Sequence, residues 1–336
     1  MVGSDGRGQI ILIGTGGSIS TLGRNGLDLL EYGDFGRIVE PDELARLYPE
    51  INEHADLVVF PFRAVPSPAL TAVDWLQLND LVHQAIEAHP AAKGVVITHG
   101  TATLEETAYF LNLTLRTDKP VVLVGAQRPP TALSSDSGLN LVNAIRVASS
   151  PDAVGRGVLA VLNDEIHSAR SVTKTNTYRL HSFRSPVFGP LGVADPDRIE
   201  FHRAPDRAHC PDTPFDVRGV ADLPRVDIAY SYAGSDGLAI RAFANVGAAA
   251  VVLAAVAPGK PTPLEEQAIR DVIRAGVIVV NSCRAGEGRV VSVARTRELG
   301  VVVADDLNPQ KARVLAMLAV RLSKDRAQLE EWFATY

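Results

Sequence analysis

The sequence predicts an α/β protein in which a larger N-terminal domain, built on a mostly parallel sheet, precedes a smaller C-terminal α/β domain. Short β-branched runs alternate with segments of helical length, which is typical of βαβ units. From residue 196 to 222, crowded prolines, arginines and aspartates interrupt the alternation, which then resumes. We therefore place the N-terminal domain at residues 8–197, a linker at 198–222 and the C-terminal domain at 223–336.

The N-terminal domain is expected to contain five strands, at residues 9–13, 57–60, 94–97, 120–124 and 157–162. Two helix starts lie between them, because Thr71 and Thr103 each stand three positions before an acid, Asp74 and Glu106. This is the spacing of a capping box. The second helix should run over residues 104–113.

The C-terminal domain repeats the pattern with expected strands at residues 226–230, 249–254 and 277–281. Thr262-Pro263 followed by Glu265 predicts a helix start between the second and third strands. The last helix is expected at residues 309–322, beginning with a proline.

Composition excludes several function classes. The chain has 336 residues, 46% of them hydrophobic, which suffices for a core without disulfides or metals. Its 33 Lys and Arg against 39 Asp and Glu give a net charge of −6 without a basic run, which disfavours a nucleic-acid partner. Two distant cysteines, Cys210 and Cys283, exclude a disulfide framework and paired-cysteine zinc or redox sites.

The N-terminal segment, Met1 to Gln9, is polar and rich in glycine, and the apolar run after it is broken by Gly14, Gly16 and Gly17. Such a segment is too short and too rich in glycine for a signal peptide or a membrane span. We therefore expect a cytoplasmic protein with no membrane partner.

Thr15 lies in a glycine-rich turn directly after the first predicted strand. The turn does not match a dinucleotide fingerprint, because the third glycine of that motif would fall at Ile19. Two interpretations remain, a tight turn with an incidental threonine or a hydroxyl presented at the carboxyl end of a strand, where α/β sheets bind ligands.

Thr101 lies in the loop after the third predicted strand, just before a helix start. Free backbone N–H groups and the helix dipole favour a developing oxyanion there. We expect Thr103 to act as the helix cap, and His99 to be a histidine held by the fold rather than a base.

Lys174 lies in a hydroxyl-rich stretch. A partly desolvated lysine there could accept a threonine proton, and an exposed lysine is the alternative. Nearby Asp164, Glu165 and His167 lack a spacing that projects two metal ligands together, so we expect no metal and no cofactor.

Together these segments resemble the bacterial L-asparaginase/glutaminase family, in the order and spacing of its type II branch. The segments that carry the resemblance are Gly14-Thr-Gly-Gly-Ser-Ile19, Ile97-Thr-His-Gly-Thr-Ala-Thr-Leu-Glu-Glu-Thr-Ala108, Val172-Thr-Lys-Thr-Asn-Thr177, Phe188-Gly-Pro-Leu-Gly192, Asp212-Thr-Pro-Phe-Asp216 and Leu307-Asn-Pro-Gln-Lys-Ala-Arg313.

The resemblance implies two α/β domains, a homotetramer built from intimate dimers, and amide hydrolysis through a threonine nucleophile and an acyl-enzyme, without metal or cofactor. Each active site would lie between one subunit's N-terminal domain and a neighbour's C-terminal domain. By motif, Thr15 would be the nucleophile, Thr101 and Lys174 would assist proton transfer, and Tyr32 would close over the substrate. The spacing from Thr15 to Tyr32 is longer than the family's usual one.

The departures from the family pattern concern substrate recognition. Ala102 replaces the Asp that binds the substrate's amino group, Pro68 follows Ser67 where the family has Gln or Ser, and Gly234 replaces an Asn. With Gly100, these are the expected substrate-binding positions. Losing two charge-assisted contacts would weaken binding of a free amino acid by about two to four decades.

The sequence therefore predicts an amidohydrolase that acts on a small linear or cyclic amide other than free L-asparagine. Two alternatives stay open: a weak ordinary L-asparaginase, in which another residue replaces the missing Asp, and a non-catalytic homologue that binds a small molecule.

Overall fold

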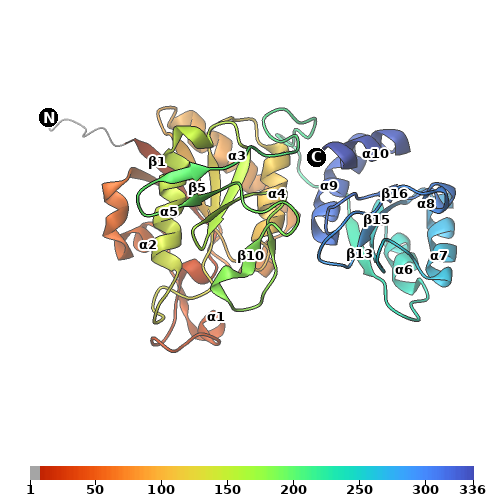
Figure 1. The fold of residues 1–336 in the computed structure, drawn as a ribbon, viewed down its shortest axis with the longest axis horizontal. Coiled ribbons are helices and arrows are strands. Elements are labelled where there is room, and N and C mark those ends of the chain that lie inside the picture. The colour runs from red at the N-terminus through yellow and green to blue at the C-terminus, as the bar shows by residue number, and fades with distance from the viewer. Residues whose placement is uncertain (1–7) are drawn as a thin grey trace. The chain divides into compact units, whose positions relative to one another are not determined.

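The computed structural model describes residues 8–336, which divide between Gly219 and Val220 into two compact units (Figure 1). Each unit is described by itself. The larger, N-terminal unit is built on a sheet dominated by parallel strands, and the smaller one on an entirely parallel sheet, so the predicted fold class is confirmed. Residues 1–7, part of the polar N-terminal segment considered above, lie outside the described residues.

The N-terminal sheet has eight strands in the order β12-β11-β8-β7-β6-β5-β1-β4. Five are parallel and match the predicted ones: β1 (Gln9–Gly14), β4 (Asp56–Pro61), β5 (Gly94–Thr98), β6 (Val121–Val124) and β7 (Val158–Leu162). Three antiparallel strands extend one edge: β8 (Glu165–Ser168), β11 (Gly192–Ala194) and β12 (Ile199–Phe201). They are short and partly polar, which hides them from a search for apolar runs, and β12 lies inside the segment predicted as a linker.

Both faces of this sheet are covered, as parallel sheets require. On one face, Ile10 and Leu12 of β1 join a core with residues of α2 (Pro41–Leu47) and α5 (Ser137–Ser149). The alternate residues Ile11 and Ile13 are equally buried. Helix α4 (Leu104–Thr114) packs on β7, and its Phe110 stacks on Trp75 of α3 (Ala72–Ala88) at 5.5 Å.

Short elements connect these layers. They are η1 (Ser18–Ser20), β2 (Thr21–Leu22), α1 (Tyr32–Phe35), β3 (Arg37–Ile38), η2 (Pro49–Glu53), η3 (Ser67–Ala69), η4 (Pro151–Ala153), β9 (Thr173–Lys174), η5 (Leu180–Ser182) and β10 (Phe183–Arg184). Strand β2 pairs with β3, and β9 with β10, in separate two-stranded sheets.

The two predicted caps of this unit differ in outcome. Thr71 and Asp74 form the expected capping box, with the Thr71 N–H donating to Asp74 Oδ2 at 2.7 Å. Thr103 occupies the N-cap position of α4, but its hydroxyl donates to the Ser67 carbonyl at 3.0 Å and caps nothing. The prediction of a side-chain cap there is wrong, because the loop that carries Ser67 offers a competing acceptor.

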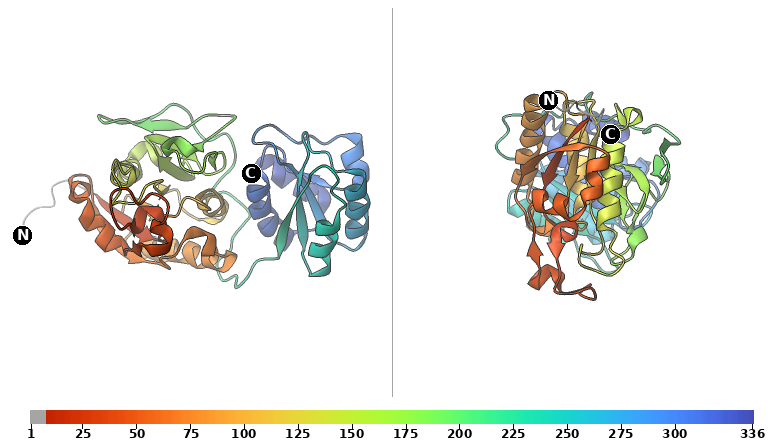
Figure 2. Two further views of the ribbon diagram at one scale, coloured as in Figure 1. Left: turned by 90° about the horizontal axis from the view of Figure 1, so that it is seen from below. Right: turned by 90° about the vertical axis from the view of Figure 1, so that its left-hand side faces the viewer.

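The C-terminal unit has four parallel strands, β13 (Val226–Tyr230), β14 (Ala250–Ala255), β15 (Ile278–Cys283) and β16 (Val302–Val303). Helices α6 (Leu238–Asn245) and α7 (Pro263–Arg274) cover one face, and α9 (Pro309–Leu322) covers the other, followed by α10 (Arg326–Thr335) (Figure 2). Helix α8 (Ala294–Leu299) precedes β16.

The capping box of Thr262 and Glu265 is confirmed at the start of α7. The prediction that the helix at residues 309–322 is the last one is wrong, because α10 follows it. Within α10 the core contacts fall mainly on Leu329 and Phe333, a single i,i+4 pair that gives little periodic signal.

Within residues 8–336, no helix combines the length and the hydropathy needed to cross a bilayer. In the same range, no group of three or more His, Cys, Asp or Glu side chains is arranged to hold a metal ion. Cys210 and Cys283 are both free thiols.

Candidate active site

The carboxyl ends of β1, β4 and β5 meet at one edge of the N-terminal sheet. Gly14 pairs with Pro61 on one side and with Thr98 on the other. The loops after these strands contain residues 15–18, 62–68 and 99–102, so three segments far apart in the sequence converge. This is the edge where open α/β sheets bind ligands.

Glycines allow these loops to approach each other. A Cβ at Gly17 would lie 2.1 Å from the Cα of Gly100, and one at Gly16 would lie 2.6 Å from the backbone of Val65. Both residues also have φ near +90°, at +84° and +90°, which non-glycine residues rarely adopt. The Gly-Gly pair is therefore required for both the close contact and the turn.

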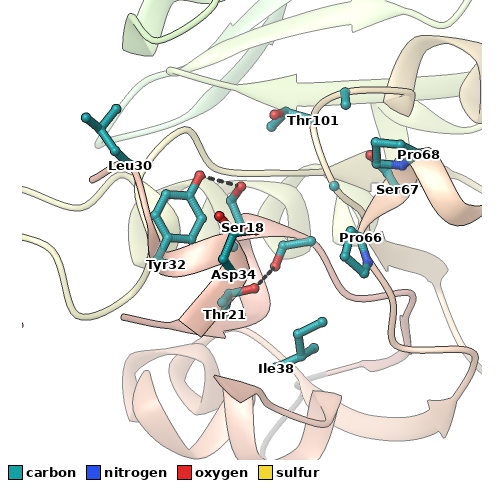
Figure 3. A pocket seen from close by; sticks show the side chains of 14 residues that line it. Ser18, Thr21, Leu30, Tyr32, Asp34, Ile38, Pro66, Ser67, Pro68 and Thr101 are labelled. Carbon is teal, nitrogen blue, oxygen red and sulfur yellow. Dashed lines mark hydrogen bonds between the residues drawn. The ribbon is translucent and has the colours of Figure 1, made fainter. Parts of the chain in front are cut away.

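The converging loops and α1 enclose a pocket of about 320 Å³ (Figure 3). Its volume is suited to a small ligand. The polar side chains that line it are Ser18, Thr21, Tyr32, Asp34, Ser67 and Thr101.

Ser18 and Tyr32 form the first contact that concerns chemistry. The Ser18 Oγ and the Tyr32 hydroxyl are 2.9 Å apart, and Figure 3 shows both side chains pointing toward each other at the pocket wall. Ser18 begins η1, directly after the glycine turn, and Tyr32 begins α1. The structure therefore brings the predicted Tyr32 to the pocket, where it meets a serine that the sequence analysis did not select.

Thr15 has a different environment. Its side chain is fully buried, its hydroxyl donates to the Thr98 carbonyl at 2.9 Å, and it does not line the pocket. The backbone N–H of Thr15 donates to the same carbonyl at 3.0 Å. The Thr15 hydroxyl is thus bound to the backbone, whereas Ser18, which follows the turn at Gly16 and Gly17, lines the pocket.

Thr101 and Lys174 form the second contact. They are 73 positions apart in sequence, and the Lys174 Nζ donates to the Thr101 Oγ1 at 2.7 Å. Burial of the lysine lowers its pKa below the ordinary value. A lysine with a lowered pKa is more often neutral, and a neutral amine can accept a proton from Thr101 or from a water bound to it.

Glu105 holds the strand that carries Lys174. The Thr173 hydroxyl and the Lys174 N–H both donate to Glu105 Oε1, at 3.0 Å and 3.3 Å. Glu105 lies in the first turn of α4, directly after the loop of Thr101. The same helix start therefore positions both members of the Thr101–Lys174 pair.

Four of the predicted substrate-binding residues line the pocket. They are Ser67, Pro68, Gly100 and Ala102. The exposed Ala102 presents only a methyl group and also lines an open groove with Lys174 and Tyr178. Gly234, the fifth, lies in the C-terminal unit after β13, in a turn with φ +85°.

His99 is held by the fold, as expected. It is fully buried, its Nδ1 lies 2.8 Å from the Gly100 carbonyl, and burial lowers its pKa to about 4. A neutral imidazole fixed on the backbone positions the loop and does not reach the pocket surface.

Comparison with known proteins identifies the family of this chain. Residues 9–207 match the family model described as asparaginase, N-terminal, and residues 225–333 match the glutaminase/asparaginase C-terminal domain. The chain is 37% identical to a glutaminase-asparaginase of Pseudomonas fluorescens biotype A, with 98% of this chain and 90% of that protein covered. It is 38% identical to L-asparaginase 2 of Bacillus subtilis, with 98% and 86% covered.

A solved structure is similar over its whole length. It is that of a probable cytoplasmic L-asparaginase from Campylobacter jejuni, with a TM-score of 0.93, 37% identity, and coverage of 98% of this chain and 100% of that one.

Proposed function

The chain belongs to the glutaminase/asparaginase family of amidohydrolases, and from this premise we propose that it hydrolyses a small carboxamide through an acyl-enzyme on Ser18. The observation that carries the proposal is the pocket lined by both Ser18, in contact with Tyr32, and Thr101, in contact with Lys174. The nucleophile in this proposal is Ser18 rather than the Thr15 expected from the sequence.

The reaction has two halves. The Ser18 Oγ attacks the amide carbonyl carbon while its proton passes to the Tyr32 oxygen, and the Tyr32 phenol proton passes on to the amide nitrogen; the 2.9 Å contact joins the two hydroxyls. The tetrahedral intermediate then breaks its C–N bond and leaves an ester on Ser18. The protonated nitrogen departs as ammonia from a primary amide and stays attached to the opened chain of a cyclic one.

Water attacks the ester in the second half. The Thr101–Lys174 pair supports this step, because a neutral Lys174 can take the proton of the attacking water through the Thr101 hydroxyl. Collapse of the second intermediate releases the acid and returns the proton to Ser18. No metal or cofactor takes part in the proposed cycle.

We propose a substrate other than free L-asparagine, of the linear or cyclic amide class. Ala102 supports this choice, since it is exposed at the pocket beside Thr101 and offers no charge to a substrate amino group. An ordinary L-asparaginase activity is the second candidate. The names of the Bacillus subtilis and Campylobacter jejuni relatives favour it.

Ammonia release from primary amides and ring opening of cyclic ones, measured as the acid formed, decide between the two. We expect the wild-type protein to prefer another amide over L-asparagine, and Ala102→Asp to raise kcat/KM for L-asparagine by about 10- to 150-fold, the value of one charge-assisted contact. Ala91→Asp is the control, because Ala91 is exposed at the opposite end of β5.

A wild-type kcat/KM for L-asparagine of about 10⁴ M⁻¹s⁻¹ or more, above that for every other amide tested, would establish the ordinary asparaginase instead. Absence of turnover on all amides, in both the wild type and Ala102→Asp, would make the chain a non-catalytic binding homologue.

We also propose the assembly and location that the family resemblance implies: a cytoplasmic homotetramer in which a neighbour's Gly234 approaches the pocket. Sedimentation velocity tests the assembly. A monomer at working enzyme concentrations with full activity would contradict an active site shared between subunits.

A further inference from the structure

Asp34 is a charged residue of the pocket that the proposed reaction does not use. It lies in α1, two positions after Tyr32, and lines the same pocket. Figure 3 draws it on the same side of the pocket as Tyr32 and Ser18, with Pro66 and Pro68 on the other side. Among the described residues that line the pocket, it contributes the only carboxylate, and none contributes a Lys, Arg or His side chain.

The Asp34 carboxylate is available to a ligand. It makes no hydrogen bond or ion pair with another residue in the described part of the chain, and its side chain is exposed. The arginine of the same loop is already engaged, since Arg24 Nε lies 3.2 Å from Asp28 and its guanidinium also pairs with Glu31. The loop is therefore ordered by an ion-pair network that leaves Asp34 out.

We infer that Asp34 binds a cationic group of the substrate and selects amides that carry an ammonium at the end away from the scissile bond. The inference rests on the proposed amide hydrolysis and names its substrate class. The pocket has no charge at Ala102, which follows Thr101, and has one at Asp34 in α1. A substrate cation would therefore bind against the wall formed by α1.

The electrostatic argument also predicts what the pocket rejects. A single carboxylate without a cation in the lining attracts cationic ligands and repels anionic ones. The preference should fall with salt, because Asp34 is exposed and exposed charges are screened. The order of kcat/KM should be ammonium amide, then neutral amide, then carboxylate amide.

Matched amides test the inference. β-Alaninamide and 4-aminobutyramide carry an ammonium, butyramide and valeramide are their neutral isosteres, and succinamate carries a carboxylate. We expect kcat/KM for the ammonium amides to exceed that for the isosteres by about five- to tenfold, as for one partly exposed charge contact. Asp34→Asn should remove this preference by lowering kcat/KM for the ammonium amides, whereas Asp118→Asn, an exposed position before β6, should keep it.

Binding separates failure of the inference from failure of the proposed function. Titration of β-alaninamide and butyramide into Ser18→Ala, with and without Asp34→Asn, measures recognition without turnover. A cation preference that disappears only with Asp34→Asn supports the inference, whether or not any amide is hydrolysed. An equal affinity for both ligands in Ser18→Ala, or a preference that survives Asp34→Asn, would overturn it.

Discussion

Replacing Ser18 and Thr15 separately tests which hydroxyl is the nucleophile. Ser18→Ala removes the proposed attacking atom and should lower kcat by roughly 10⁴-fold or more, as in other hydrolases without their nucleophile. The structural cost should be small, because Ser18 is partly exposed and its hydroxyl makes one described contact, with Tyr32.

Thr15→Val keeps the shape of a fully buried side chain and removes one hydrogen bond to the Thr98 carbonyl. That carbonyl still accepts the Thr15 N–H at 3.0 Å, so no buried acceptor is left without a partner. The loss is therefore about 0.5–1.5 kcal/mol of unfolding free energy, or a few degrees in Tm, with kcat within about threefold of the wild type.

The assay combines ammonia release with the mass of the acid-quenched enzyme, followed by peptide mapping of the acyl adduct. We expect the adduct on Ser18 in the wild type and in Thr15→Val, and none in Ser18→Ala. An adduct on Thr15, or a folded Thr15→Val that has lost more than about 10³-fold in kcat while Ser18→Ala remains active, would refute the assignment.

Two further predictions concern pH. Burial lowers the pKa of Lys174, so kcat/KM should rise with pH as the amine becomes neutral, with a midpoint below 10.5. In Lys174→Met this rise of kcat/KM with pH should disappear, and kcat/KM should fall by about 10²- to 10⁴-fold. The exposed Lys324→Met is the control, and an unchanged profile in Lys174→Met would exclude the role. Burial lowers the pKa of His99 from 6.5 to about 4. The folded protein therefore keeps this histidine neutral while the unfolded chain protonates it, and the free energy of unfolding should fall by about 3 kcal/mol between pH 6.5 and pH 4. Urea midpoints at pH 7 and pH 4 should show a smaller acid loss in His99→Gln than in the exposed His202→Gln, and equal losses would contradict it.

The parallel strands could be predicted from the sequence because each contains a continuous apolar run. Strands β1, β5 and β6 consist mainly of β-branched and aliphatic residues, and their side chains are buried on both faces of the sheet. Strands β11 and β12 have three residues each, and β11 pairs with the edge of β8 while β12 pairs with β11. Such pairing depends on tertiary contact, which a local pattern does not contain.

The site could be predicted in part. The resemblance to the family pointed to Thr101 and Lys174, and the fold places the Lys174 Nζ 2.7 Å from the Thr101 Oγ1. It also selected Thr15, by its place in the glycine-rich motif after the first strand, and it did not point to Ser18. Which of the two hydroxyls reaches the pocket depends on the positive φ of Gly16 and Gly17, which sequence does not reveal.

The arrangement of the pocket lets recognition change while the chemistry stays. Ala102 follows Thr101, but the Lys174 contact to Thr101 depends on β9 and on Glu105, so it forms without a carboxylate at residue 102. An acid there would favour the protonated lysine and raise its pKa, against the effect of burial. With alanine, burial acts alone and Lys174 becomes neutral at lower pH. Ala102 therefore suits Lys174 to accept a proton, and within the proposed function this argues for altered substrate choice rather than for lost catalysis.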